Sequence, residues 1–160
     1  VIAIRDEGVA IVQFDDPSLC LFVDPRVQAQ YEDASAEIEY AVELLNETVS
    51  GIDNIKLALH LCRRNKGRSG WIGEGGYEPI LPALKNLVFD ALMLEFAMPA
   101  AGDKNILAKL PERFEVGLGC VDFRNPHIHT PDEIINRVKQ ALNYLPPESI
   151  FLHPDFGFAP

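Results

Sequence analysis

The sequence predicts an α/β fold, namely a (β/α)8 TIM-type barrel to which this chain supplies about five parallel strands and four helices. Segments typical of strands and of helices alternate along the chain, as they do where helices join parallel strands. The predicted strands are almost continuously apolar, which is typical of strands covered on both faces. Polar side chains follow the strand ends, where the catalytic groups of barrel enzymes gather. Together these three observations favour a barrel.

Five segments are predicted to be strands because each is a short apolar run rich in branched side chains. They cover residues 9–15, 55–62, 91–96, 115–122 and 149–154. The polar residues at or just beyond their ends are Asp15, Asp16, His60, Cys62, Glu95, Asp122 and Asp155. A doubly wound dinucleotide-binding sheet is the alternative. It lacks support because no Gly-x-Gly-x-x-Gly turn follows the first strand.

Four segments between these strands are predicted to be helices. They cover residues 37–49, 78–87, 105–110 and the stretch that follows Thr130. The last has the clearest start, because Thr130 can cap the helix, Pro131 suits the first helical position and Glu133 can complete a capping box. The alternation of strand and helix thus extends along the whole chain.

Residues 1–160 are predicted to form a single partial catalytic barrel domain, the C-terminal portion of a longer protein. A full barrel has eight strands and about 250 residues, whereas five strands are predicted here. The remaining strands are expected from the same protein, another chain or a homo-oligomer. Side chains such as Leu57, Leu59 and Leu92 are expected to face the barrel lumen, and the first strand to expose a free edge.

The composition argues against two classes of partner. The chain has 24 acidic and 14 basic residues, a net charge of −10, whereas a nucleic-acid-binding protein needs a cationic face. No apolar stretch is long enough to cross a bilayer, and the first residues do not resemble a signal peptide. The three cysteines form no disulfide framework, so we expect a reducing, cytoplasmic location.

A possible metal site lies at the end of the second predicted strand. His60 and Cys62 are two residues apart, so their side chains point to the same face of a strand. Nitrogen and sulfur ligands together suit zinc. The spacing alone is weak evidence, because a cysteine is often simply a small buried residue.

Longer motifs strengthen this interpretation. Five segments resemble, in the same order, motifs of the cobalamin-independent methionine synthase family, a barrel family of the fold shared with uroporphyrinogen decarboxylase. They are Val12-Gln13-Phe14-Asp15-Asp16-Pro17, His60-Leu61-Cys62-Arg63-Arg64-Asn65 with Gly75-Gly76-Tyr77-Glu78-Pro79, Ala91–Phe96, Gly117-Leu118-Gly119-Cys120-Val121-Asp122 and Pro154-Asp155-Phe156-Gly157-Phe158. The matches extend over nearly the whole chain.

The resemblance implies roles for individual residues. Zinc would be held by His60, Cys62 and Glu95. The catalytic residues would be Asp15, His60 and Asp122, and Asp15 would also hold the amino group of a thiol substrate. Substrate contacts are expected from Asp15, Asp16, Arg63, Asn65 and Tyr77. Phe156 stands where the family has its last cysteine ligand, so zinc is expected to bind weakly or not at all.

The activity implied by the resemblance is zinc-dependent methyl transfer from a methylated folate to homocysteine. Its partners would be a small-molecule thiol and an alkyl donor. The alternatives are a thiol–epoxide transferase of the coenzyme M type, or a barrel that lost its zinc through Phe156 and has another catalytic or binding role. His153 or Cys120 could replace the missing ligand, and His127 with His129 forms a His-x-His pair on a loop.

Overall fold

The computed structural model describes residues 1–64, 72–124 and 126–157. Its centre is one sheet of five parallel strands in the order β1-β2-β3-β4-β5. Their bounds are β1 (Ile11–Asp16), β2 (Lys56–Leu61), β3 (Ala91–Leu94), β4 (Glu115–Val121) and β5 (Ile150–Pro154). The chain is therefore a partial barrel, as predicted, with the five strands in sequence order.

The helices connect the strands and also add turns that the sequence pattern did not predict. They are α1 (Ile2–Asp6), α2 (Pro17–Leu21), α3 (Pro25–Gln28), α4 (Ala34–Thr48), α5 (Leu81–Leu84), α6 (Pro131–Ala141) and the 3-10 turns η2 (Pro99–Ala101), η3 (Lys104–Lys109) and η4 (Pro147–Ser149). Asp16 and Asp24 cap α2 and α3, and each helix starts with proline. Among the described helices, none has the length and apolar character needed to cross a membrane.

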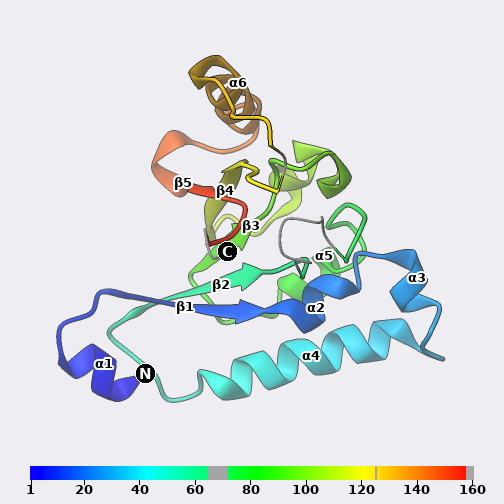
Figure 1. Cartoon of the computed structure of the whole chain (residues 1–160). Helices are drawn as coiled ribbons and strands as arrows, with labels where there is room; N and C mark the ends of the chain where they lie inside the picture. Colours follow the sequence, from blue (N-terminus) through cyan, green and yellow to red (C-terminus); the bar gives the residue numbers. More distant parts are fainter. Residues whose placement is uncertain (65–71, 125, 158–160) are drawn as a thin grey trace.

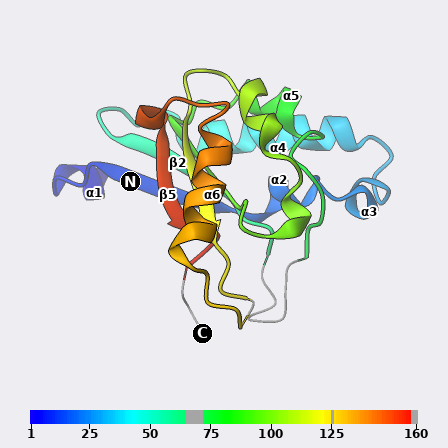
Figure 2. The same cartoon turned by 90° about the horizontal axis from the view of Figure 1, so that it is seen from above.

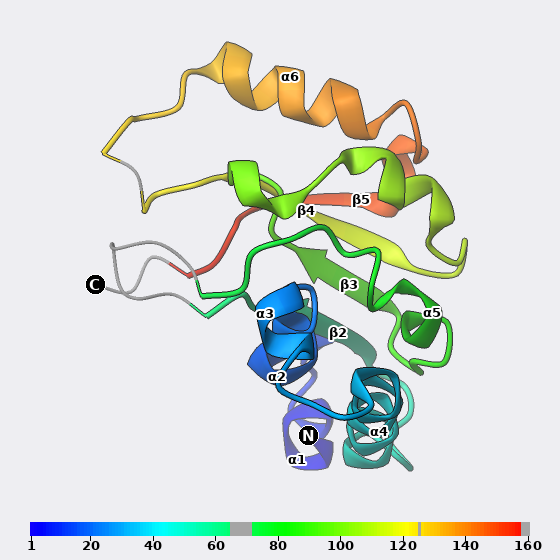
Figure 3. The same ribbon diagram turned by 90° about the vertical axis from the view of Figure 1, so that its right-hand side faces the viewer.

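Different helices lie beside different strands of the sheet. In Figure 1, α4 runs alongside β1 and β2, whereas α6 lies beside β4 and β5. Figure 3 shows β2 to β5 stacked as neighbours between α4 below and α6 above. In the view from above, β5 runs down the picture, and its arrowhead marks the carboxyl end of the strand (Figure 2). The parallel strands thus bring their carboxyl ends to one side.

Alternate residues of the strands face the helices. Leu57, Leu59 and Leu92 are 6%, 0% and 0% exposed and belong to the hydrophobic core, together with Ile38 and Val42 of α4. The expectation that these leucines face the barrel lumen is therefore wrong. The apolar run did not reveal which of its alternate side chains point to the lumen, because both sets are apolar.

The opposite face of the sheet is its inner face. A shallow apolar groove there is lined by Ile11, Gln13, Lys56, Ala58, Ala91, Met93 and Phe151. Ile11 is 48% exposed and Phe151 is 39% exposed. Lys56 pairs with Glu115 across this face at 2.6 Å. Because β1 and β5 each have one strand neighbour, this face is the wall of an unclosed barrel.

Candidate functional site

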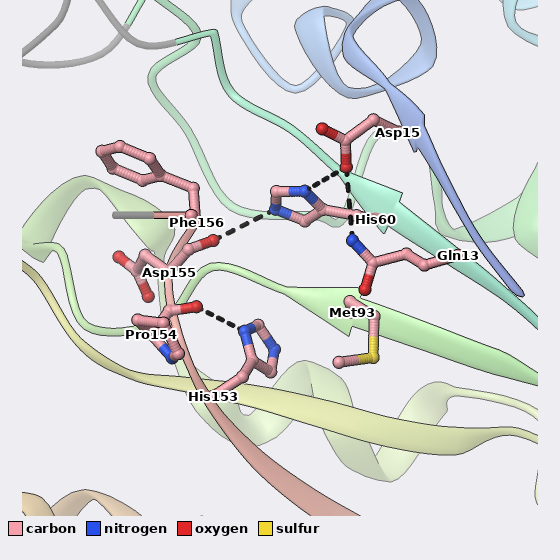
Figure 4. Close-up of a pocket in the computed structure, with 9 residues that line it drawn as sticks. Gln13, Asp15, His60, Met93, His153, Pro154, Asp155 and Phe156 are labelled. Atoms are coloured by element: carbon pink, nitrogen blue, oxygen red, sulfur yellow. Dashed lines mark hydrogen bonds and ion pairs between the residues drawn. The ribbon is translucent and has the colours of Figure 1, made fainter. Parts of the chain in front are cut away.

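A pocket of about 320 Å3 opens at the carboxyl ends of the strands. Figure 4 shows side chains from β1, β2, β3 and β5 pointing into it. Its lining residues are Gln13, Asp15, His60, Met93, His153, Pro154, Asp155, Phe156 and Gly157. The pocket continues the inner face of the sheet, so it occupies the position at which barrel enzymes hold their substrates.

His60 is held on both sides of its ring. It is 4% exposed, and its Nδ1 lies 2.7 Å from Asp15 Oδ1 while its Nε2 lies 3.1 Å from the Asp155 carbonyl oxygen (Figure 4). Nε2 is also 3.5 Å from Glu95 Oε1. Burial opposes a charge on the ring, but hydrogen bonding with Glu95 and Asp15 outweighs it and raises the pKa of His60. Both ring nitrogens thus face acceptors, which favours the imidazolium form.

Glu95 lies just beyond β3, and its side chain is completely buried. Its Oε1 accepts a hydrogen bond from the Arg63 backbone N–H at 3.1 Å, and its Oε2 accepts one from Arg124 Nη1 at 3.1 Å. The Tyr77 hydroxyl accepts the Glu95 backbone N–H at 2.9 Å. Both carboxylate oxygens therefore have protein donors.

Arg124 lies at the centre of a buried cluster of three carboxylates. Its side chain is 2% exposed. Besides Glu95 it contacts Asp122 Oδ1 through Nε at 2.6 Å and Asp155 Oδ2 through Nη2 at 2.6 Å. The motifs in the sequence indicated no role for Arg124. The sequence offered one indication of its role, namely that Arg124 is a basic residue shortly after the strand-end acid Asp122.

Asp155 connects this cluster to the loop after β3. Its Oδ1 accepts the backbone N–H groups of Phe96 and Ala97 at 3.1 and 2.9 Å. Burial raises the pKa of Asp155 to about 6, although the Ala97 N–H and the Arg124 charge favour the carboxylate. A side chain at Gly119 would collide with Asp155 Oδ1, so β4 needs glycine there.

The two aspartates at the end of β1 have different positions. Asp15 pairs with His60, and its side chain is 65% exposed at the pocket. Asp16 instead caps α2, where its two oxygens accept the N–H groups of Ser18 at 3.1 Å and Leu19 at 2.8 Å. Asp16 was predicted to contact substrate, whereas in the structure its side chain caps α2.

Two other predicted substrate contacts, Arg63 and Tyr77, do not line this pocket. Arg63 is 0% exposed and Tyr77 is 1% exposed, and the guanidinium of Arg63 lies 4.5 Å from the centre of the Tyr77 ring. Arg63 also donates to the Gly75 carbonyl at 2.7 Å. Both side chains therefore support the loop and the Glu95 backbone. Asn65, the remaining predicted contact, lies outside the described residues.

The possible ligand atoms of the three predicted zinc ligands, His60, Cys62 and Glu95, do not all lie within 4.8 Å of one another. Within the part of the chain that the structure describes, the one group of three possible ligands whose atoms all lie within 4.8 Å of one another is His127, His129 and Glu133. His60 and Glu95 approach each other, but Cys62 does not complete their set. Burial raises the pKa of the Cys62 thiol.

Phe156 stands where the resemblance in the sequence predicts a cysteine ligand. Its ring lies 4.3 Å from the Phe123 ring and 4.8 Å from the Arg124 guanidinium carbon. A phenyl ring supplies no metal ligand, but it can face a cation. The position is thus filled by an aromatic contact to Arg124.

The two possible replacement ligands differ in their contacts, and the buried Nε2 of His153 has no hydrogen-bond partner among the described residues. His153 lines the pocket, and its Nδ1 lies 2.5 Å from the Pro154 carbonyl oxygen. Burial lowers the pKa of His153. The Cys120 thiol donates a hydrogen bond to the His153 carbonyl oxygen, with an Sγ–O distance of 3.5 Å. Neither residue belongs to a group of three clustered ligands among the described residues.

The His-x-His pair, His127 and His129, lies in the loop before α6. His127 Nε2 is 2.9 Å from Glu133 Oε1, and His129 Nε2 donates to the Asp122 carbonyl at 3.1 Å. Arg137 Nη2 approaches His129 Nδ1 at 3.4 Å, so a cation already stands beside the remaining nitrogen. The group stabilises the loop that leads into α6.

Comparisons with known proteins identify the family that the chain resembles. The whole chain, residues 1–160, matches the family model described as the catalytic domain of cobalamin-independent synthase. The methionine synthase of Pyrococcus abyssi is 32% identical over 154 residues, which cover 96% of this chain and 38% of that protein. The methionine synthase of Sulfurisphaera tokodaii is 29% identical over 152 residues, covering 95% and 37%. The chain thus spans less than half the length of these relatives.

A solved structure shows the same fold. The B12-independent methionine synthase from Shewanella sp. W3-18-1, in complex with selenomethionine, superimposes with a TM-score of 0.71 at 19% sequence identity. The match covers 94% of this chain and 42% of the other. This structure too relates the chain to part of a larger protein.

Proposed function

The chain belongs to the cobalamin-independent synthase catalytic-domain family, and from this premise we propose that it forms part of the catalytic barrel of an enzyme that transfers a methyl group to the sulfur of homocysteine. The observation that carries the proposal is the position of His60 at the end of β2. It faces the pocket between Asp15 and Asp155. The named relatives are methionine synthases, which favours this activity over thiol–epoxide transfer.

The proposed substrate contact is Asp15. Its carboxylate is exposed at the pocket and fixed by His60 and by Gln13, whose Nε2 lies 3.4 Å away. A carboxylate held in this way can bind the ammonium group of an amino-acid thiol. The related Shewanella structure contains selenomethionine, an amino acid with the same backbone groups as homocysteine. We therefore assign the amino-acid end of the substrate to Asp15.

The proposed role of His60 is electrostatic. An imidazolium at the pocket wall stabilises the negative charge of a substrate thiolate near it. In the reaction, the sulfur–carbon bond forms while the nitrogen–carbon bond of the methyl donor breaks, and the thiol proton ends on the donor nitrogen. Asp155 and Asp122 lie behind this wall of the pocket. Both bind Arg124, which also binds Glu95 beside His60.

Zinc is the cofactor that the resemblance implies, and the residues present do not fit it. Cys62 stays outside the group formed by His60 and Glu95, Phe156 supplies no ligand, and both oxygens of Glu95 have protein donors. A zinc-bound histidine also needs a lone pair on the nitrogen that faces the metal, whereas His60 Nε2 faces oxygen acceptors.

The test joins this chain to the barrel strands that it lacks, taken from the Pyrococcus abyssi relative. Methionine formed from homocysteine and a methylated folate is measured by mass spectrometry, and binding of methionine by calorimetry. Asp15→Asn should weaken binding by about 10- to 100-fold, the value of a hydrogen bond to a charged group. Asp53→Asn is the matched control, because Asp53 is an exposed aspartate in the loop before β2.

The expected result is methionine formation with a raised KM for Asp15→Asn and an unchanged KM for Asp53→Asn. A joined barrel that folds but neither binds methionine nor forms it would refute the proposed function. Equal binding by both variants would remove Asp15 from the substrate site.

A further inference from the structure

The guanidinium of Arg124 has the contacts expected of a bound cation. Each of its three nitrogens donates to a different carboxylate. Nε donates to Asp122 at 2.6 Å, Nη1 to Glu95 at 3.1 Å and Nη2 to Asp155 at 2.6 Å. Asp155 and Glu95 are completely buried. Arginine remains charged in any protein environment, and its planar fork suits carboxylates. The cluster therefore contains its own counter-charge.

This cation lies where it competes with a metal ion. Glu95 is one of the three residues that the family resemblance assigns to zinc, and its Oε2 is used by Arg124. A metal ion at Glu95 would face a fixed positive charge in a dry interior, where like charges repel strongly. It would also displace the hydrogen bond that Arg63 gives to Oε1. Zinc could enter only if this network came apart.

Phe156, the residue that departs from the family motif, contacts the Arg124 guanidinium. Phe156 stands at the place of a sulfur ligand, and its ring lies 4.8 Å from the Arg124 guanidinium carbon. A cysteine at 156 would favour a metal, whereas an aromatic ring favours an organic cation. The missing ligand and the internal cation thus form one local arrangement.

We propose that Arg124 is a built-in counter-cation that takes the place of the metal ion in this chain, holding Glu95 and Asp155 in position and excluding zinc. It is a positioning residue, since it acts through Glu95, Asp155 and Phe156. The inference deepens the proposed function and rests on it for the identity of the site. Its test uses zinc affinity and thermal stability, so it can fail or succeed independently of methyl transfer.

The experiment compares the chain with three variants: Arg124→Met, Phe156→Cys and the double variant. All proteins also carry His127→Gln, which removes the His127–His129–Glu133 group as a second zinc site. Zinc affinity is measured by competition with a chromophoric chelator, zinc content by elemental analysis and the melting temperature with and without zinc.

The parent chain should hold no stoichiometric zinc, and Phe156→Cys alone should gain little because Arg124 remains. Arg124→Met should melt at a lower temperature, since buried carboxylates lose their counter-charge. In the double variant zinc should bind at least about tenfold more tightly than in Phe156→Cys, a change typical of altered groups around a metal. Added zinc should restore part of its melting temperature.

Arg113→Met is the matched control. Arg113 also faces an aromatic ring, with its guanidinium 3.9 Å from the centre of Phe114, but it donates to backbone carbonyls such as that of Phe89 at 2.9 Å. Its loss should lower the melting temperature without any rescue by zinc. Arg124→Lys keeps a charge and should exclude zinc as the parent does. If Arg124→Met does not fold, it is refolded in the Phe156→Cys background with zinc present.

Stoichiometric zinc in the parent, with Arg124 in place, would overturn the proposal. So would equal zinc affinity in Phe156→Cys and the double variant, or rescue of Arg113→Met by zinc. Failure of the double variant to refold with zinc would also count against it.

Discussion

The two faces of the sheet differ in how completely this chain covers them. On the helix-covered face, Leu59, Leu61 and Leu94 are at most 1% exposed. On the inner face, Ile11 and Phe151 remain 48% and 39% exposed around a shallow groove. The outer layer of the barrel is thus complete over these strands, whereas the inner layer needs further strands to cover it.

The candidate site has one part that is buried and one part that is open to solvent. Behind the pocket, the cluster around Arg124 is built from β3, β4 and β5 and the loops that follow them, and is closed to solvent. In front of it, Asp15 is open at the edge strand β1. The chain therefore supplies the buried cluster behind the pocket, whereas the substrate side is open at the edge of the sheet.

The largest expected effect is on the buried cluster. Asp155→Ala should lower the free energy of unfolding by about 3–5 kcal/mol, because it leaves the buried Arg124 short of one partner and two backbone N–H groups without an acceptor. Urea unfolding followed by circular dichroism measures the change. An exposed aspartate, Asp132→Ala, is the control, and a decrease below about 1 kcal/mol for Asp155→Ala would show that the cluster is not closed.

The next effect compares the two faces directly. Leu59→Ala should cost about 2–5 kcal/mol because it opens a cavity in the helix-covered core. Met93→Ala, on the inner groove, should cost about 1 kcal/mol or less in the isolated chain, because the methionine is already partly exposed. Equal costs in urea unfolding would mean that the inner face is covered in solution, for example by a second copy.

The strands could be predicted from the sequence because their signal is local. Each predicted run matches an observed strand within a few residues, and the capping box predicted at Thr130 and Glu133 is present. The short helices α2 and α3 were missed because each is a single proline-led turn, too short for a helical period. The direction of Leu57 and Leu59 was missed because alternation is invisible in a fully apolar strand.

The site could be predicted only in part. Strand-end positions and motifs found the acids and His60, and the structure brings His60, Glu95 and Asp155 together. They did not find Arg124, because its three partners come from the ends of three different strands. The burial of Arg63 and Tyr77 was likewise hidden, since a charged loop residue is usually exposed.

A smaller effect concerns the helix that covers β4. The Thr130 backbone N–H, then His127 and the Thr130 hydroxyl, lower the pKa of Glu133 to about 2. Its folded pKa lies below the ordinary value of 4.5, so its contribution is complete above that pH and is lost as the pH falls toward 2. Glu133→Gln should remove this part of the pH dependence in thermal melts at pH 2 to 6. Thr130→Ala should cost about 1 kcal/mol, and identical pH profiles for Glu133→Gln and the parent would exclude the capping role.

The smallest effect in the isolated chain is expected at the open edge of the sheet. Ile11 lies on β1 and is 48% exposed, so Ile11→Lys should change the free energy of unfolding by no more than about 0.5 kcal/mol. In the barrel completed with strands from the Pyrococcus abyssi relative, the same change should cost more, because the added strands would bury the lysine charge. Urea unfolding of both forms, with the exposed Ile128→Lys as control, separates the two cases. A large decrease in the isolated chain, together with dimers in sedimentation that the change abolishes, would show that a second copy covers the inner face. An equal, small decrease in both forms would mean that the missing strands do not pack on this wall, so the barrel would have to close elsewhere.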